Sequence, residues 1–144
     1  MNRLLKLLIV DDENQILATY KSFFDKRGFL VETATNGEEG LEKLRYGEFD
    51  VAIVDILMPK MDGLALVEKV SQEGIDTSII VLTGHGEKEH AIKAINLRIV
   101  EAWYEKATIR LEDLLEKVKT IGEVIPIDEV RRILSKLPNN DKEA

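Results

Sequence analysis

Polar residues follow the apolar segments of this sequence at the points where strands would end. The set contains three carboxylates, one hydroxyl and one ammonium, on Asp11, Asp12, Asp55, Thr83 and Lys106. Because the carboxyl ends of parallel strands lie along one edge of a sheet, we expect these side chains to converge there. Carboxylates a few ångströms apart repel each other, and a hard divalent cation relieves that repulsion. Mg²⁺, which prefers one or two carboxylates with water and phosphate oxygens, suits this set.

The same side chains have the types that phosphoryl transfer requires. A phosphoryl group in transit needs its oxygens neutralised and held in line more than it needs covalent help. Mg²⁺, the Lys106 ammonium and the Thr83 hydroxyl can each take one of those oxygens, which leaves one carboxylate as the nucleophile. Asp55 is the natural candidate, because it directly follows the fully apolar segment 51–54. The sequence therefore predicts an aspartate that accepts a phosphoryl group.

The elements that must position these residues alternate between short apolar segments and helical patterns. Five apolar segments predict strands, at residues 4–10, 30–35, 51–54, 78–82 and 102–105. Between and after them, apolar residues recur at helical spacing. In the fourth helix of the series these residues are Ala91, Ile92 and Ile95. A βα unit repeated five times predicts one doubly wound α/β domain, in which a five-stranded parallel sheet carries helices on both faces.

The composition is that of a folded, acidic domain. The chain has 144 residues, the size of one domain, and its 44% hydrophobic and 33% charged residues indicate a soluble globular protein rather than a disordered one. Its formal net charge of −7 argues against nucleic acid or an acidic membrane surface as a partner. The chain has no cysteine, which excludes disulfides and thiolate chemistry and is compatible with the cytoplasm.

The first residues allow two interpretations, a short signal peptide or a strand. Residues 1–3 followed by the apolar segment 4–10 resemble a signal peptide. However, Lys6 interrupts the apolar segment, and Asp11 ends it without a small-residue cleavage site, so we interpret it as a strand. No apolar stretch of the sequence approaches the roughly 20 residues that a membrane-spanning helix needs.

Three stretches and one lysine resemble a known family. They are Leu-Ile-Val-Asp11-Asp12-Glu13, Asp55-Ile-Leu-Met58-Pro59-Lys-Met61-Asp62-Gly63, Val-Leu-Thr83-Gly and Lys106. Together they resemble the receiver domain of bacterial two-component response regulators, in its stand-alone, CheY-like form, from about Lys6 to about Ile121. The resemblance implies a flavodoxin-like fold whose strands have the order 2-1-3-4-5.

The resemblance also implies which residues accept the phosphoryl group and hold the metal. Asp55 is the phosphoacceptor, and Asp12 ligates Mg²⁺ directly. Asp11 acts on the ion largely through water. Asp55 and the backbone carbonyl of Leu57 complete the ligands that the protein supplies.

A switch is implied in the same way, next to a segment that departs from the family. Lys106 pairs with the phosphate, Thr83 supplies the switch hydroxyl, and Trp103 is the switch aromatic, where the family usually has tyrosine or phenylalanine. The family also has proline where this chain has Ala107, and a small pair where residues 99–100 are Ile and Val. We predict a trans Lys106–Ala107 bond, because a cis bond without proline costs about 2.5–4 kcal/mol.

The chain divides into a predicted receiver domain at residues 1–122 and a C-terminal extension at 123–144. Four apolar residues of the extension share one helix face: Val130, Ile133, Leu134 and Leu137. They predict a short amphipathic helix at about 128–137, with Asp128 near its N-cap and a polar tail behind it. Because a lone helix of this length is marginal in water, we expect its apolar face to pack on the domain or on a second protomer.

The leading hypothesis from this resemblance is a receiver that takes a phosphoryl group from a sensor histidine kinase or a histidine phosphotransfer protein onto Asp55, with Mg²⁺. It would catalyse only its own phosphotransfer and dephosphorylation and signal by binding a downstream protein. We expect a cytoplasmic monomer or weak dimer without nucleic-acid or membrane partners. The main alternative is a receiver fragment of a longer regulator or hybrid kinase. A haloacid-dehalogenase-like phosphatase fits less well, since it normally needs a second acid two residues after its nucleophile, where this chain has Leu57.

Overall fold

The computed structural model describes residues 4–56, 58, 60–84, 96–122 and 127–137. Its elements, in chain order, are β1 (Lys6–Val10), α1 (Asn14–Asp25), β2 (Leu30–Ala34), α2 (Gly37–Gly47), β3 (Val51–Asp55), α3 (Gly63–Gln72), β4 (Ser78–Thr83), β5 (Val100–Glu105), α5 (Leu111–Gly122) and α6 (Ile127–Ser135). The predicted strands are confirmed, with ends that differ by one or two residues. The predicted fourth helix lies outside the described residues.

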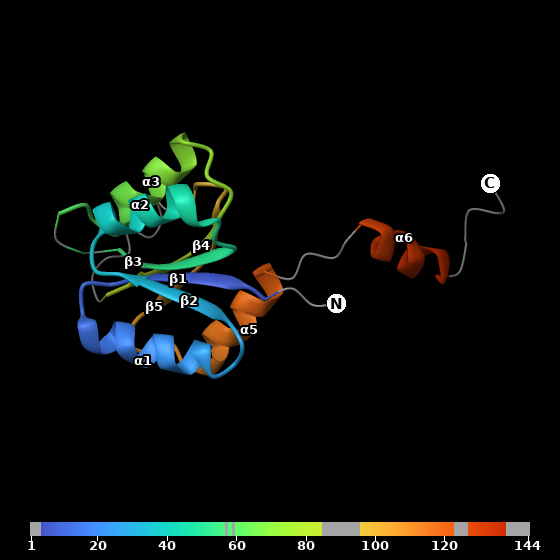
Figure 1. The fold of residues 1–144 in the computed structure, drawn as a ribbon, viewed down its shortest axis with the longest axis horizontal. Coiled ribbons are helices and arrows are strands. Elements are labelled where there is room, and N and C mark those ends of the chain that lie inside the picture. Colours follow the sequence, from blue (N-terminus) through green and yellow to red (C-terminus); the bar gives the residue numbers. More distant parts are fainter. Residues whose placement is uncertain (1–3, 57, 59, 85–95, 123–126, 138–144) are drawn as a thin grey trace.

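The strands form one five-stranded sheet in the order β2-β1-β3-β4-β5, and every neighbouring pair is parallel. Helices α1 and α5 cover one face of the sheet, and α2 and α3 cover the other (Figure 1). This arrangement confirms the doubly wound, flavodoxin-like fold and its strand order. The central strand β3 is buried at every residue, which explains why its sequence is apolar up to Asp55.

The hydrophobic core has two halves, one on each face of the sheet. Successive side chains of a strand point to opposite faces, so β1 contributes to both halves. Leu8 and Val10 pack with the side chains of α2 and α3, whereas Leu7 and Ile9 pack with those of α1 and α5. The central strands are therefore held from both sides, and this fixes the positions of the polar residues at their ends.

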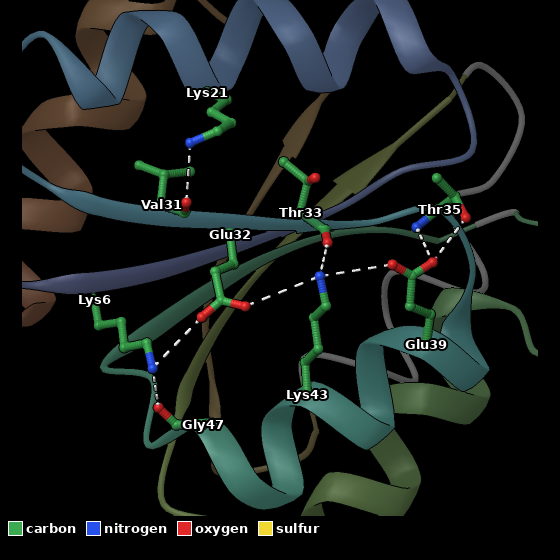
Figure 2. Close-up of polar contacts among 9 residues, drawn as sticks. All are labelled: Lys6, Lys21, Val31, Glu32, Thr33, Thr35, Glu39, Lys43 and Gly47. Atoms are coloured by element: carbon green, nitrogen blue, oxygen red, sulfur yellow. Dashed lines mark hydrogen bonds and ion pairs between the residues drawn. The ribbon is translucent and has the colours of Figure 1, made fainter.

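Two lysines cover the outer edge of β2, as Figure 2 shows. Lys21 of α1 donates a hydrogen bond to the backbone oxygen of Val31 at 3.2 Å, and Lys43 of α2 donates one to that of Thr33 at 2.5 Å. In the described sheet β2 pairs with β1 alone, so these carbonyls belong to its free edge. The lysines satisfy two acceptors that would otherwise be open to pairing with another strand.

Strand β5 pairs with β4 through an irregular register. Val100 and Ala102 lie opposite consecutive residues of β4, so Glu101 is an extra residue between them. Further along, Trp103 lies opposite Val81 of β4, which belongs to the core half beneath α2 and α3. Trp103 itself is 38% exposed. The strand starts two residues before the predicted segment 102–105. The extra residue Glu101 is a β-bulge, and it lies between residues 99–100 and Trp103, where the sequence departs from the family pattern.

Two further expectations concern the backbone. No peptide bond in the described ranges is cis, which confirms the predicted trans Lys106–Ala107 bond. Within those same ranges, no helix has both the length and the apolar sequence of a membrane span.

Helix α6 begins at Ile127 and ends at Ser135, so it differs slightly from the predicted 128–137. Asp128 is the second residue of the helix and therefore lies near its N-terminus, as predicted. Figure 1 shows α6 beyond the helices that cover the sheet. Three apolar side chains of this segment are exposed: Ile133, Leu134 and Leu137. These side chains are therefore not buried against the domain, and a contact of this face with a second protomer stays a prediction. The domain boundary at residue 122 also stays a prediction.

Candidate functional site

The side chains predicted to converge lie together at the carboxyl edge of the sheet. Asp55 and Thr83 are the last residues of β3 and β4, Asp11 and Asp12 directly follow β1, and Lys106 directly follows β5. Hydrogen bonds continue past the strand ends, since the Lys106 N–H donates to the Thr83 backbone oxygen at 2.8 Å. The sheet itself therefore sets the positions of all five residues.

Three of these residues form an acidic cluster. Carboxylate oxygens of Asp11, Asp12 and Asp55 lie within 4.8 Å of one another; Asp11 and Asp55 are buried and Asp12 is exposed. The Glu13 N–H donates to Asp11 Oδ1 at 2.9 Å, and the buried Oδ2 of Asp11 lies 2.7 Å from the ammonium nitrogen of Lys106. Three carboxylates at this spacing fit a hard cation such as Mg²⁺, which binds oxygen ligands. Leu57, whose carbonyl was the other expected ligand, lies outside the described residues.

Lys106 connects this cluster to a further acid. Its Nζ lies 2.7 Å from Asp11 Oδ2, 3.0 Å from Asp55 Oδ2 and 3.1 Å from Glu13 Oε1. Burial is the largest influence on the pKa of Lys106 and would lower it. The polar contacts with Asp11 and Asp55 together outweigh burial, so the pKa is raised well above its ordinary value. The side chain therefore carries a fixed positive charge at neutral pH.

Glu13 also belongs to the site, although residue type and spacing had assigned no role to it. It is the N-cap residue of α1, with an extended backbone (φ −92°, ψ 108°) and no capping hydrogen bond from its side chain. Its carboxylate instead contacts Lys106. The signal that could have indicated this contact was its position between the acid pair and a helix that starts at the site edge.

The loop after β3 explains why Asp62 and Gly63 follow the central aspartate at fixed spacing. Asp62 caps α3, since its Oδ1 accepts a hydrogen bond from the Ala65 N–H at 2.8 Å. The Gly63 N–H donates to the Ile56 backbone oxygen at 2.8 Å, and a Cβ at Gly63 would collide with the backbone of Asp55. The chain therefore turns back tightly against the end of β3, and only glycine fits at that point of contact.

The two residues expected to form a switch lie on neighbouring strands. Thr83 is buried, and its Oγ1 donates a hydrogen bond to the backbone oxygen of Tyr104 at 3.3 Å. This bond connects the end of β4 to β5. Trp103 directly precedes Tyr104 on that strand. The contact gives Thr83 a connection to the strand of the aromatic, while the switch role of both residues stays a prediction.

The arrangement of acids, hydroxyl and lysine matches a known family along most of the chain. The family model for the response regulator receiver domain matches residues 7–119. This chain belongs to that family. The match includes every site residue from Asp11 to Lys106, so the resemblance seen in the sequence is confirmed. Receiver domains are signalling modules of two-component systems rather than enzymes that turn over an external substrate.

Curated proteins similar to this receiver domain are longer regulators. The transcriptional regulatory protein DltR of Streptococcus agalactiae is 28% identical over 115 residues, which cover 80% of this chain and 50% of DltR. The response regulator SaeR of Staphylococcus epidermidis is 37% identical over 91 residues, which cover 63% of this chain and 39% of SaeR. The chain therefore spans half or less of the length of these relatives.

Solved receiver structures have the same fold. A CheY-like response regulator receiver domain protein from Methanospirillum hungatei is 34% identical, with a TM-score of 0.76, and the match covers 82% of this chain and 93% of that one. The response regulator TrrA from Thermotoga maritima, solved in complex with Mg²⁺ and BeF, is 31% identical, with a TM-score of 0.70 and coverage of 82% and 99%.

Proposed function

We propose that this receiver domain takes a phosphoryl group onto Asp55 from the phosphohistidine of a sensor histidine kinase or a histidine phosphotransfer protein. The observation that carries the proposal is the position of the Asp55 carboxylate, which ends the buried central strand with its Oδ2 3.0 Å from Lys106 Nζ. Asp11 and Asp12 complete an acidic cluster around it. A nucleophile, a place for a cation and a fixed ammonium are thus within reach of one phosphoryl group.

In the proposed reaction, an oxygen of the Asp55 carboxylate forms a bond to phosphorus while the bond from phosphorus to the donor's imidazole nitrogen breaks. The electron pair of the broken bond stays on that nitrogen, and the receiver then carries an acyl phosphate. Lys106 neutralises one phosphoryl oxygen. The Thr83 hydroxyl donates to another after it leaves the backbone oxygen of Tyr104, which it contacts at 3.3 Å in the resting site.

Asp11, Asp12 and Asp55 would hold Mg²⁺, with the backbone carbonyl of Leu57 as a further ligand. We expect Asp12 to bind directly and Asp11 to act largely through water. The ion, when bound, supplies positive charge that offsets the carboxylates and the phosphoryl oxygens. Two observations support this part of the proposal: carboxylate oxygens of Asp11, Asp12 and Asp55 lie within 4.8 Å of one another, and TrrA was solved with Mg²⁺ and BeF.

The proposed catalysis is limited to the domain's own phosphoryl group, which it accepts and later loses to water. The alternative of a haloacid-dehalogenase-like phosphatase loses support for two reasons. The family model that matches is that of receivers, and the position two residues after Asp55 is Leu57, which cannot serve as an acid.

The proposed output is contact with a downstream protein by a monomer or weak dimer, through a switch at Thr83 and Trp103. A cytoplasmic location belongs to the same proposal, because histidine kinases take their phosphoryl group from ATP, which is a cytoplasmic compound. Nucleic acid is not among the partners proposed for these 144 residues, although one relative is named a transcriptional regulatory protein and the chain covers 50% of it. Whether the reading frame continues past Ala144 decides between a stand-alone receiver and part of a longer regulator or hybrid kinase.

Mass spectrometry after incubation with Mg²⁺ and acetyl phosphate or phosphoramidate tests the acceptor. We expect one added phosphoryl group per chain, located at Asp55, and no addition when Mg²⁺ is chelated. Asp55→Asn should abolish labelling, whereas Asp76→Asn, the same change at an exposed aspartate, should leave it intact. Labelling of the Asp55→Asn protein at the level of the parent would overturn the assignment.

A further inference from the structure

We infer that Glu13 is a positioning residue that acts as a latch on Lys106: its carboxylate holds the ammonium in the resting site and must release it before a phosphoryl oxygen can bind there. The inference rests on the proposed function, because it concerns the regulation of the same site. It starts from the contact between Glu13 Oε1 and Lys106 Nζ at 3.1 Å.

The ammonium of Lys106 is fully occupied in the resting site. A lysine ammonium has three N–H donors. Among the residues that the structure describes, three carboxylates lie within contact distance of Lys106 Nζ: Asp11 at 2.7 Å, Asp55 at 3.0 Å and Glu13 at 3.1 Å. A phosphoryl oxygen can therefore reach the ammonium only if one of these carboxylates gives up its place.

Glu13 is the carboxylate that can leave. Its side chain is 60% exposed, compared with 2% for Asp11 and 8% for Asp55, so water can hydrate it after release. A released Asp11 would become a buried charge without a counter-ion, which is far more costly. Asp55 is the group that receives the phosphoryl. The negative charge of Glu13 also repels an arriving anion, so both effects oppose phosphoryl binding.

The structure makes Glu13 suitable for a clean substitution. Although it is the N-cap residue of α1, its side chain makes no capping hydrogen bond. The contact that starts the helix uses its backbone oxygen, which accepts from the Leu17 N–H at 3.1 Å. Removal of the side chain should therefore leave the beginning of α1 intact, and a thermal unfolding curve of each variant checks this.

Titration calorimetry with beryllofluoride, a stand-in for the phosphoryl group, tests the latch at saturating Mg²⁺. Glu13→Gln and Glu13→Ala should bind the analogue about two- to fivefold more tightly than the parent, the range of an exposed ion pair. The difference should shrink as salt is added, because the Debye length falls to roughly 3 Å at 1 M. Affinity for Mg²⁺ alone should stay equal or weaken, because a negative charge has been removed.

Glu42→Gln is the matched control, since it removes one negative charge from an exposed position in the middle of α2. It should bind the analogue as the parent does. Equal affinities for the parent and both Glu13 variants would overturn the latch and leave the acceptor proposal standing. A parent that fails to bind the analogue with Mg²⁺ present would overturn the proposed function, and the latch with it.

Discussion

The Nζ of Lys106 lies 3.0 Å from Oδ2 of Asp55, across a sequence separation of 51 residues. Their strands are not neighbours, because β4 lies between β3 and β5 in the sheet. The lysine thus reaches over the end of β4 to neutralise a carboxylate buried at the end of the central strand. Asp11 contacts the same ammonium, so one cation holds together two buried acids that repel each other.

Lys106→Met should therefore destabilise the domain in the absence of Mg²⁺. Removal of the ammonium leaves Asp11 and Asp55 as adjacent buried charges, which we expect to lower the free energy of unfolding by about 3 kcal/mol. Millimolar Mg²⁺ should restore part of this loss, because the cation takes over the neutralising charge. Urea unfolding in EDTA and in Mg²⁺ measures both effects.

The pH and a second variant control this experiment. Since the folded-state pKa of Lys106 is raised above its ordinary value of 10.5, the stability that it contributes is fully present below that value and is lost as the pH rises through the folded-state pKa. Measurement at pH 7 therefore sees the whole effect. Lys119→Met, at an exposed position of α5, should change stability by less than about 0.5 kcal/mol. Equal stability of the two variants would contradict the role of Lys106.

The positions of the site residues could be predicted because each follows a strand. The apolar segment before Asp55 indicates a strand buried on both faces, and its end indicates the sheet edge. The apolar segments before Asp11 and Thr83 predict parallel strands in the same way, so these two residues are expected at the same edge. The strand order came from the family resemblance, because local patterns do not specify which strands are neighbours.

Other features depend on contacts between elements and could not be predicted. The extra residue Glu101 arises from the register between β4 and β5, which neither strand encodes alone. The contact of Glu13 with Lys106 joins two loops at the edge of the sheet. No sequence pattern specified this contact, because an acidic residue before a helix is common whether or not it has a partner. The exposure of Leu134 could not be predicted either, because an amphipathic pattern does not specify whether the domain covers the apolar face of the helix.

The edge of β2 gives a second prediction. Replacement of Lys21 and Lys43 by Met together should promote self-association, because the backbone oxygens of Val31 and Thr33 lose their donors and the strand edge becomes available for pairing. Sedimentation velocity over a range of concentrations should show a larger associated fraction than in the parent.

A control separates this effect from added apolar surface. Lys26→Met places the same side chain at an exposed position at the end of α1, away from the β2 carbonyls. This variant should sediment like the parent. If the Lys21 and Lys43 double variant did the same, the lysines would have no protective role at the edge.

Truncation after Gly122 gives a third prediction. Because Ile133 and Leu134 are exposed rather than buried against the domain, the truncated protein should unfold within about 0.5 kcal/mol of the parent. Weak self-association of the parent at high concentration should decrease, since the apolar face of α6 is removed. Leu134→Ser in the full chain should also reduce self-association relative to the parent. A large loss of stability on truncation would instead show that α6 packs on its own domain.

The last prediction concerns the bond from Thr83 Oγ1 to the backbone oxygen of Tyr104, at 3.3 Å. In the proposed active state the hydroxyl donates to a phosphoryl oxygen, so this link between β4 and β5 must break. Trp103 directly precedes Tyr104 and is 38% exposed, which places its ring where a change in β5 alters its contact with water. The two states then differ in a surface that a partner protein can distinguish.

Fluorescence reports this change without a label, because Trp103 is the single tryptophan of the chain. We expect Mg²⁺ with beryllofluoride to shift its emission. Thr83→Ala should reduce the shift, since no hydroxyl moves, whereas Thr83→Ser, which keeps the hydroxyl, should retain it. Calorimetry must show that each variant binds the analogue. An unaltered spectrum in a parent that binds it would mean that Trp103 is static, and the signal would then have to pass through another part of the domain.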